Sequence, residues 1–142
     1  MAVQGPFRCL GHRILSSDRT HPLIAAAGLR DLLLLFCGRR LLLRIEGRSM
    51  QPTLEPGDRV LVRWLGQTAA PSPGSVVVTW HPQRSGLRLI KRLSRVDCTG
   101  LWLLGDNPVE STDSRQLGAV PAKLLIGEVV GRLPLGESEQ SR

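Results

Sequence analysis

The sequence predicts an all-β (mainly β) fold with a short N-terminal helix, and three observations support this fold class. From residue 41 onward, short apolar runs alternate with breaks that contain Pro and Gly, which is typical of all-β domains. The breaks carry turn signals at residues 55–58, 71–74 and 85–86. Aromatic residues make up only 4% of the chain and tyrosine is absent, so aliphatic side chains must form the core. A length of 142 residues fits one such domain with a single active site.

Residues 1–40 are expected to form an N-terminal extension. Its first part, of about 20 residues, shows no sustained periodicity and reads as poorly ordered. Residues 23–37 predict a short apolar helix, which either packs on the domain or lies on a membrane surface with its arginines meeting lipid phosphates. Arg30 and Asp31 interrupt the apolar stretch, so no run reaches the length of about 18 residues that a spanning helix requires.

The main domain is expected at residues 41–134, followed by a polar tail at residues 135–142. Six runs within the main domain predict β-strands, because each is short, rich in aliphatic residues and bounded by turn signals. These runs are residues 41–46, 59–64, 75–81, 87–94, 101–104 and 125–133.

The charge and the cysteine content limit which partners and cofactors are expected. The formal net charge of +7 would suit nucleic acid or an anionic membrane, but the 19 basic residues are scattered and accompany no nucleic-acid-binding motif. We therefore expect no nucleic-acid partner. The cysteines Cys9, Cys37 and Cys98 lie far apart without a CxxC pair, which predicts neither a disulfide framework nor a zinc site. We expect no metal and no cofactor.

Ser49 follows the end of a predicted strand and precedes Pro52, whose fixed φ and missing N–H begin a turn. A serine at such a junction can expose its hydroxyl for chemistry. For this segment taken alone, a solvated loop serine is the better interpretation.

Lys91 gives a stronger signal, because only two of the basic residues are lysines, Lys91 and Lys123. Arginine stays charged in proteins, whereas a buried lysine can lose its proton and act as a base. Alternation along the strand places Lys91 on a leucine-rich face. That face also carries Leu87, Leu89 and Leu93. Desolvation there would lower the lysine pKa, although an edge-strand lysine whose amine reaches water explains the segment equally well.

A third polar segment follows the predicted strand at residues 101–104. Ser111, Asp113 and Arg115 occur at every second position, so they would share one side of an extended loop. Asp113 and Arg115 could pair and stiffen the loop, which would leave the Ser111 hydroxyl to orient an amine across a cleft. The alternative is a capped surface turn whose screened ion pair is worth at most about 1 kcal/mol.

Three motifs in the expected order resemble signal peptidase I and the related serine-lysine endopeptidases. They are the Ser-Met-x-Pro-Thr-Leu-x-x-Gly-Asp run at residues 49–58, the basic strand in which Lys91 precedes Arg92, and the Gly-Asp-Asn-x-x-x-Ser-x-Asp-Ser-Arg-x-x-Gly-x-Val run at residues 105–120. The resemblance implies a signal-peptidase-like or LexA-like β-fold. It also implies that residues 41–134 are a serine-lysine peptidase domain.

The same resemblance implies roles for five residues. Ser49 is expected to be the nucleophile and Lys91 the general base. Ser111 is expected to orient the lysine, with Asp113 and Arg115 as a supporting pair.

Gly47 is a departure from the family pattern. Some bacterial signal peptidases carry a serine at this place, two residues before the nucleophile, whose hydroxyl helps to form the oxyanion hole. The Ser49 backbone N–H is expected to supply one oxyanion donor. The second donor would have to be a backbone group or Arg48.

The phrases at residues 45–50 and 105–108 are most similar to nickel-type superoxide dismutase maturation proteases. This similarity implies that the enzyme removes an N-terminal leader from the precursor of a nickel superoxide dismutase. The precursor would bind as an extended peptide. The expected location is cytoplasmic or membrane-associated. In the second case the contact with the membrane would be peripheral.

Other functions stay open. A general or organellar-type signal peptidase I would cleave secretory leaders with the same dyad. A self-cleaving repressor-like protein would cut itself at Ala27-Gly28 or Cys37-Gly38, although little sequence precedes these bonds to form a DNA-binding domain. A noncatalytic module would hold an extended peptide by strand addition. A Ser-His-Asp triad would need a histidine such as His81, which nothing in the sequence pairs with Ser49.

Overall fold

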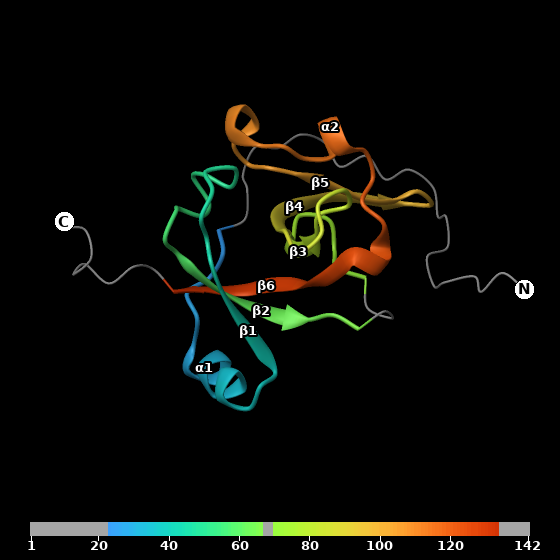
Figure 1. Cartoon of the computed structure of the whole chain (residues 1–142). Coiled ribbons are helices and arrows are strands. Elements are labelled where there is room, and N and C mark those ends of the chain that lie inside the picture. The colour runs from blue at the N-terminus through green and yellow to red at the C-terminus, as the bar shows by residue number, and fades with distance from the viewer. Residues whose placement is uncertain (1–22, 67–69, 134–142) are drawn as a thin grey trace, which may run out of the picture.

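An antiparallel β-sheet is the central structural element of the described chain (Figure 1). The structure is a computed structural model that describes residues 23–66 and 70–133. Within these residues the sheet has six strands in the order β1-β2-β6-β3-β4-β5. The strands are β1 (Arg40–Arg44), β2 (Arg59–Trp64), β3 (Val76–Trp80), β4 (Arg88–Asp97), β5 (Gly100–Leu104) and β6 (Leu125–Leu133). The sheet confirms the predicted all-β fold class.

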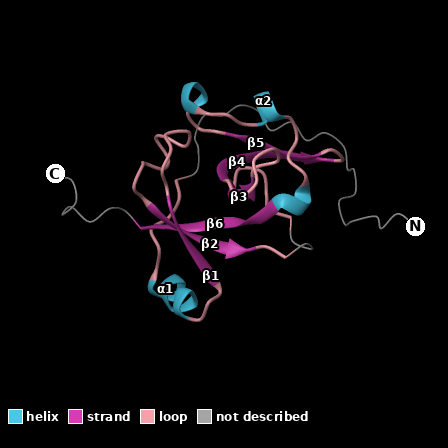
Figure 2. Cartoon of the chain, viewed as in Figure 1, coloured by secondary structure: helices cyan, strands magenta, loops and turns pink. Residues whose placement is uncertain are grey.

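Short helices lie around the sheet (Figure 2). The helix α1 (Leu29–Phe36) precedes β1 and contacts it. Between β5 and β6 the chain forms the 3-10 turn η1 (Pro108–Glu110), the four-residue helix α2 (Ser114–Leu117) and the 3-10 turn η2 (Ala122–Leu124). The sheet therefore builds the core, and the connections around it carry the polar segments.

The core consists of two aliphatic clusters, because successive side chains of a strand point to opposite faces. Val76 and Val78 of β3 belong to the first cluster, whereas Val77 between them belongs to the second. The other buried members of the first cluster are Ile45, Met50, Leu54, Val60, Val62, Ile126 and Val129. The other buried members of the second cluster are Leu93, Leu101, Leu103 and Val120. Both clusters are aliphatic, as the low aromatic content predicts.

The predicted strands agree closely with the observed ones, and the largest difference is in β4. The sequence predicts a strand over residues 87–94, whereas β4 continues to Asp97. Its last residues pair with β5 in a hairpin in which Asp97 lies opposite Gly100, after a register shift between Leu93 and Arg95. The shift breaks the regular alternation, which explains why the pattern of the sequence ends too early.

The segment before α1 is extended, so the predicted helix over residues 23–37 is wrong in its first part. The helix begins at Leu29. The Arg132 N–H donates to the Ala25 carbonyl at 3.0 Å, and the Ala27 N–H donates to the Arg132 carbonyl at 3.0 Å. A Cβ added at Gly131 would lie 3.2 Å from the Cα of Ala27, so glycine allows this close pairing. The end of β6 thus uses backbone groups that a longer helix would need for its own hydrogen bonds.

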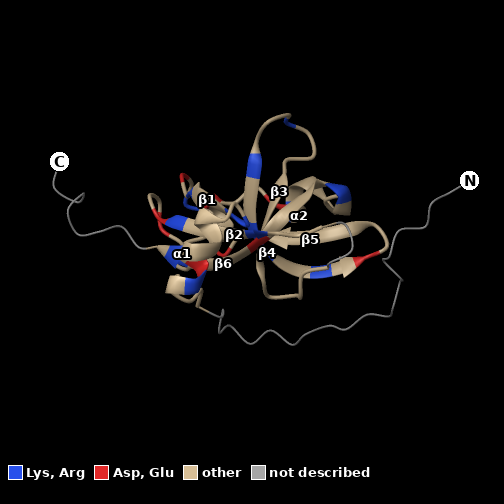
Figure 3. Ribbon diagram, turned by 90° about the horizontal axis from the view of Figure 1, so that it is seen from below, with Lys and Arg blue, Asp and Glu red and all other residues tan. Residues whose placement is uncertain are grey.

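Basic residues are spread over several elements (Figure 3). In residues 23–66 and 70–133, no helix is long and apolar enough to cross a membrane.

The expectations for the first residues of the N-terminal extension, Cys9 among them, and for the tail at residues 135–142 lie outside the described residues. The proposed domain boundaries stay predictions.

Candidate active site

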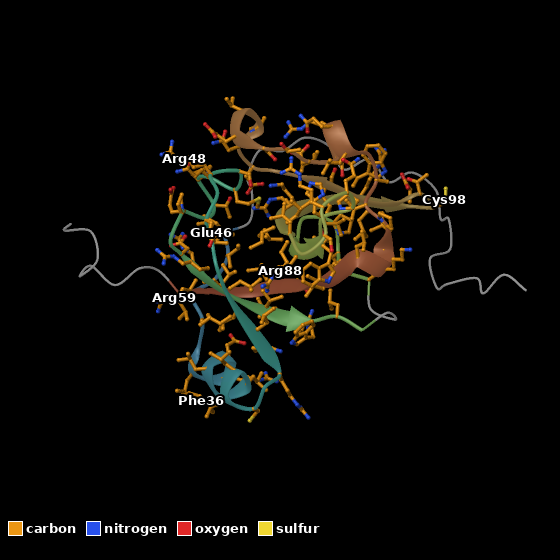
Figure 4. The ribbon with its side chains drawn as sticks, in the orientation of Figure 1. Phe36, Glu46, Arg48, Arg59, Arg88 and Cys98 are labelled. Carbon is orange, nitrogen blue, oxygen red and sulfur yellow. The ribbon has the colours of Figure 1, made fainter. Side chains whose placement is uncertain are left out.

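Ser49 lies in the compact turn that follows β1. The Gln51 N–H donates to the Arg48 carbonyl at 3.1 Å, and the Leu54 N–H donates to the Met50 carbonyl at 2.9 Å. Met50 and Leu54 anchor the turn in the first aliphatic cluster, where they are 2% and 0% exposed. Ser49 itself is half-buried, and Arg48 extends outward from the turn (Figure 4). The turn therefore holds the Ser49 hydroxyl at the edge of the core.

The strand β4 brings the Lys91 amine to this hydroxyl. Lys91 lies opposite Val77 of β3 in the sheet register and is only 5% exposed. Its Nζ lies 2.6 Å from the Ser49 Oγ. Among the described residues, the Lys91 amine forms no ion pair. The alternative of a lysine that reaches water is wrong, because the side chain is buried beside Ser49.

Burial lowers the pKa of Lys91 below its ordinary value, because the ammonium form loses its hydration. The negative charge of Asp113 opposes this effect and raises the pKa, but burial dominates. The net direction favours the neutral amine. A neutral amine at this distance can accept a proton from the Ser49 hydroxyl.

Asp113 and Arg115 lie at the start of α2. The backbone at Asp113 is extended, as predicted, but the helix begins at Ser114, so the prediction of an extended loop is wrong for Arg115. Asp113 is the N-cap of α2, and its carboxylate accepts the Arg115 N–H at 3.1 Å. The Gln116 side chain accepts the Asp113 N–H at 3.0 Å, which completes a capping box. The Arg115 guanidinium also donates to the Asp113 carboxylate, at 2.9 and 2.6 Å. The predicted pair is therefore present, although the cap turns the chain into a helix.

Ser111 is buried beside the Asp113 carboxylate. Its hydroxyl donates to Asp113 Oδ2 at 2.7 Å, and the Gly105 N–H donates to the same oxygen at 2.8 Å. Burial alone would raise the pKa of Asp113, but hydrogen bonds from Arg115, Gly105 and Ser111 outweigh burial and hold that pKa well below its usual range. The charged carboxylate therefore fixes the Ser111 hydroxyl.

Gly105 and Asn107 join this segment to the nucleophile turn, a role that the sequence interpretation did not assign. The Asn107 N–H donates to the Ser49 carbonyl at 2.9 Å. A Cβ added at Gly105 would lie 2.1 Å from the Ser111 Oγ and 2.7 Å from the Ser49 carbonyl oxygen. Only glycine fits between these atoms. The structure thus brings Ser49 and Ser111 together at Gly105, while the Lys91 amine contacts the Ser49 hydroxyl.

A buried Arg92–Asp106 pair lies beside the Ser49–Lys91 contact and was also not assigned from the sequence. Arg92 donates to both carboxylate oxygens of Asp106, at 2.9 and 2.7 Å, and their side chains are only 9% and 2% exposed. The Thr53 hydroxyl donates to Asp106 at 2.6 Å, and Arg92 also donates to the Gly74 carbonyl at 2.7 Å. The network ties the nucleophile turn, β4 and the Gly-Asp-Asn turn together. Its sequence signal was an arginine directly after the candidate base.

His81 has a structural partner instead of Ser49. Its Nδ1 accepts the N–H groups of Gln83 and Arg84, each at 3.1 Å, and so caps the turn between β3 and β4. Slight burial and the nearby charge of Arg84 lower its pKa. The other two histidines lie outside the described residues. The part of the chain that is described therefore offers no Ser-His pair.

No cluster of three or more His, Cys, Asp or Glu side chains that could hold a metal ion occurs within residues 23–66 and 70–133.

Comparison with known proteins identifies a family and a relative. The family model described as Peptidase S24-like matches residues 34–130, more than half of the chain and a range that includes Ser49, Lys91 and Ser111. The protein named mitochondrial inner membrane protease subunit 1 of Schizosaccharomyces pombe is 34% identical over 109 residues. This alignment covers 62% of the present chain and 69% of the yeast protein.

Proposed function

Because the chain belongs to the Peptidase S24-like family, we propose that it is a serine endopeptidase in which Ser49 and Lys91 form the catalytic dyad. The broader assignment, a signal-peptidase-like protease, rests on the family and on the yeast relative. The observation that carries the dyad is the contact of 2.6 Å between the Lys91 Nζ and the Ser49 Oγ, made by an amine whose side chain is 5% exposed.

In the proposed reaction, the neutral Lys91 amine accepts the Ser49 proton while the Oγ attacks the carbonyl carbon of the scissile peptide bond. The resulting ammonium then gives a proton to the leaving amine as the C–N bond breaks, which leaves an acyl-enzyme at Ser49. Lys91 next takes a proton from a water molecule, whose oxygen attacks the acyl carbon. The Lys91 ammonium then returns this proton to the Ser49 Oγ as the ester bond breaks, which releases the carboxylic acid product and restores the neutral amine.

The other residues have positioning roles in this proposal. Ser111, held by Asp113, orients the lysine, and Arg115 keeps Asp113 charged. The Ser49 N–H is the first oxyanion donor, and such a donor typically contributes about 3 kcal/mol to transition-state stabilisation. With Gly47 two residues earlier, the second donor comes from a backbone group or from Arg48.

For the substrate, we propose the precursor of a nickel-type superoxide dismutase, from which the enzyme removes the N-terminal leader. The support is the sequence similarity at residues 45–50 and 105–108. The printed name of the yeast relative favours a second candidate, an organellar-type signal peptidase that acts on other leaders. The cytoplasmic or membrane-associated location remains a proposal in both cases.

The self-cleaving alternative has contacts against it. The Ala27 N–H donates a hydrogen bond to the Arg132 carbonyl, and the Gly38 N–H donates to the Leu35 carbonyl at the end of α1. Both candidate bonds thus belong to ordered backbone of the described chain, and self-cleavage would first have to release them.

The test incubates the full chain with the nickel superoxide dismutase precursor and, separately, with a generic secretory leader peptide, and sequences the new N-termini. We expect precursor cleavage by the wild type and no cleavage by Ser49→Ala. Cleavage of the generic leader alone would overturn the substrate but keep the dyad. Cleavage of either substrate by Ser49→Ala would overturn the dyad. Fragments of the protein itself that end at Ala27 or Cys37 would favour the self-cleaving alternative.

A further inference from the structure

The helix α1 presents an apolar face to solvent. Leu29, Leu33 and Phe36 are 76%, 60% and 89% exposed. Their spacing of four and three residues places them on one face of the helix. Figure 4 shows Phe36 at the outer edge of α1, away from the sheet. An amphipathic helix of a globular domain normally turns its apolar stripe toward the core, so this outward face is unusual.

The opposite side of α1 fixes the helix on β1. The residues on that side, Leu34 and Leu35, are half-buried, and so is Leu32 at the border between the two sides. Asp31 on the same side forms an ion pair with Arg40 of β1, with 3.7 Å between the Asp31 Oδ1 and the Arg40 Nη2. Because the inner side of α1 contacts β1 and Asp31 pairs with Arg40, the helix is held with its apolar face toward solvent.

Two basic residues accompany the outer face, Arg30 within α1 and Arg39 just after its C-terminal end. Arg30 and Arg39 are exposed, and neither forms an ion pair within residues 23–66 and 70–133. Asp31 is the only acidic residue in the sequence from 23 to 45, and it already pairs with Arg40. An apolar helix face bordered by unpaired arginines has the chemistry of an interfacial helix that binds anionic lipid.

We propose that the outer face of α1, formed by Leu29, Leu33 and Phe36 with Arg30 and Arg39, docks on the surface of an anionic lipid bilayer. The apolar side chains enter the boundary between headgroups and acyl chains, and the two guanidinium groups bind lipid phosphates. The proposal goes beyond the proposed peptidase activity and does not depend on it.

The fold places this surface away from the nucleophile turn. The helix α1 precedes the five-residue strand β1, and the Ser49 turn follows it, so the two lie at opposite ends of that strand (Figure 1). A bilayer bound at α1 would therefore leave the Ser49 turn open to substrates from the aqueous side.

The test measures sedimentation of the full chain with two kinds of vesicle, phosphatidylcholine alone and phosphatidylcholine with phosphatidylglycerol. We expect binding to the vesicles with phosphatidylglycerol. The triple variant Leu29→Ser, Leu33→Ser and Phe36→Ser should bind them about tenfold less or weaker still. The double variant Arg30→Ser and Arg39→Ser should lose the preference for anionic vesicles.

A matched control removes exposed apolar side chains elsewhere. Leu87 and Val109 are 43% and 92% exposed but lie outside α1, so the Leu87→Ser and Val109→Ser double variant should bind like the wild type. All exchanged side chains are exposed, and circular dichroism would verify that each variant is folded.

Equal binding by the wild type and the triple variant would overturn the proposal, as would equal sedimentation with both kinds of vesicle. Sedimentation velocity of the same proteins tests a second copy as the occupant. A wild-type dimer that becomes monomeric in the triple variant, without vesicle binding, would assign the face to contact between copies. None of these measurements uses peptidase activity, so their failure is distinct from failure of the proposed function.

Discussion

Lys91 and Arg92 are neighbours on β4, and the structure accommodates these two buried cations in opposite ways. They are 5% and 8% exposed. The Asp106 carboxylate compensates the charge of Arg92, because both of its oxygens accept hydrogen bonds from the guanidinium. Lys91 instead contacts the Ser49 hydroxyl, and burial lowers its pKa. One cation is thus compensated, and the other is driven toward its neutral form.

This difference separates positioning from reactivity. Arginine cannot lose its proton at ordinary pH, so Arg92 is suited to holding parts of the protein together. Through Asp106 and Thr53 it links β4 to the turn that carries Ser49. Lysine can titrate, so the proposed proton transfer falls to Lys91.

The largest expected effect comes from replacing Lys91, the cation that can titrate. Lys91→Met should lower the rate of peptide cleavage by about 10⁴-fold or more, the size of the loss when a member of a Ser-His-Asp triad is removed. The same change should raise the melting temperature, because methionine fills the site without the desolvation that disfavours the lysine cation. Cleavage assays and thermal unfolding of the same sample measure both.

Retained activity in Lys91→Met would contradict the role of the base. A lower melting temperature would contradict the claim that burial of the Lys91 ammonium destabilises the folded protein. The sign is fixed by linkage: with a folded-state pKa below the unfolded one, the unfolded chain binds more protons, so the contribution of Lys91 to stability rises with pH.

The second prediction concerns the Arg92–Asp106 pair, in which the charge of the cation is compensated. Asp106→Asn should lower the free energy of unfolding by about 3 kcal/mol, because the Arg92 cation would remain buried without its carboxylate. Urea denaturation measures the loss. The double variant Arg92→Met and Asp106→Leu should recover part of this stability, since it removes both charges. A fully stable Asp106→Asn variant would show that the pair does not hold the turns together.

The third prediction concerns the junction between the two sides. Gly105→Ala would place a Cβ 2.1 Å from the Ser111 Oγ and 2.7 Å from the Ser49 carbonyl oxygen, so these groups must move. A displacement of about 1 Å at a reacting group typically costs about 10²-fold in rate, and we expect a kcat loss of that order. Gly118→Ala is a control outside the site, with nothing within 4 Å of its added Cβ, although its φ of 74° predicts some loss of stability. Equal kcat losses in the two variants would contradict a specific role for Gly105.

The smallest expected effect sharpens the electrostatic description of Lys91. Activity should rise with pH through the pKa of Lys91, because the base must be neutral. Asp113→Asn removes the negative charge that raises this pKa, so the acid limb of kcat/KM against pH should move to lower pH. Glu110→Gln removes an exposed carboxylate from the same connection and should leave the limb in place. A limb that moves to higher pH in Asp113→Asn would contradict the assigned interaction.

The sequence predicts the sheet well because the alternation of buried side chains is a local signal. It does not predict the pairing of Ala25 and Ala27 with Arg132, because this contact joins segments about 100 residues apart and leaves no local pattern. The start of α2 carried a readable signal, since Asp113 and Gln116 have the spacing of a capping box. Interpreting Ser111, Asp113 and Arg115 as an alternating loop concealed that signal.

Burial at the candidate site was predictable on one face of β4 only. Lys91 was placed on a face with leucines, which allowed burial but equally allowed an amine that reaches water, and the structure shows it only 5% exposed. Arg92 falls on the other face of the strand, where a charged side chain normally indicates solvent. Its burial depends on the carboxylate of Asp106, which arrives from a different turn. Strand periodicity cannot show such a partner.

The proposed catalysis depends on the ionisation of Lys91, and the chain allows a direct measurement of it. Lys123 is the only other lysine, and Lys123→Arg leaves Lys91 as the single source of a lysine ε-carbon signal. An NMR titration of this variant, labelled with ¹³C at the lysine ε-carbon, reports the pKa of Lys91 alone. We predict a midpoint clearly below the ordinary lysine value, and a downward shift of that midpoint in Asp113→Asn. A midpoint at the ordinary value would contradict Lys91 as the general base.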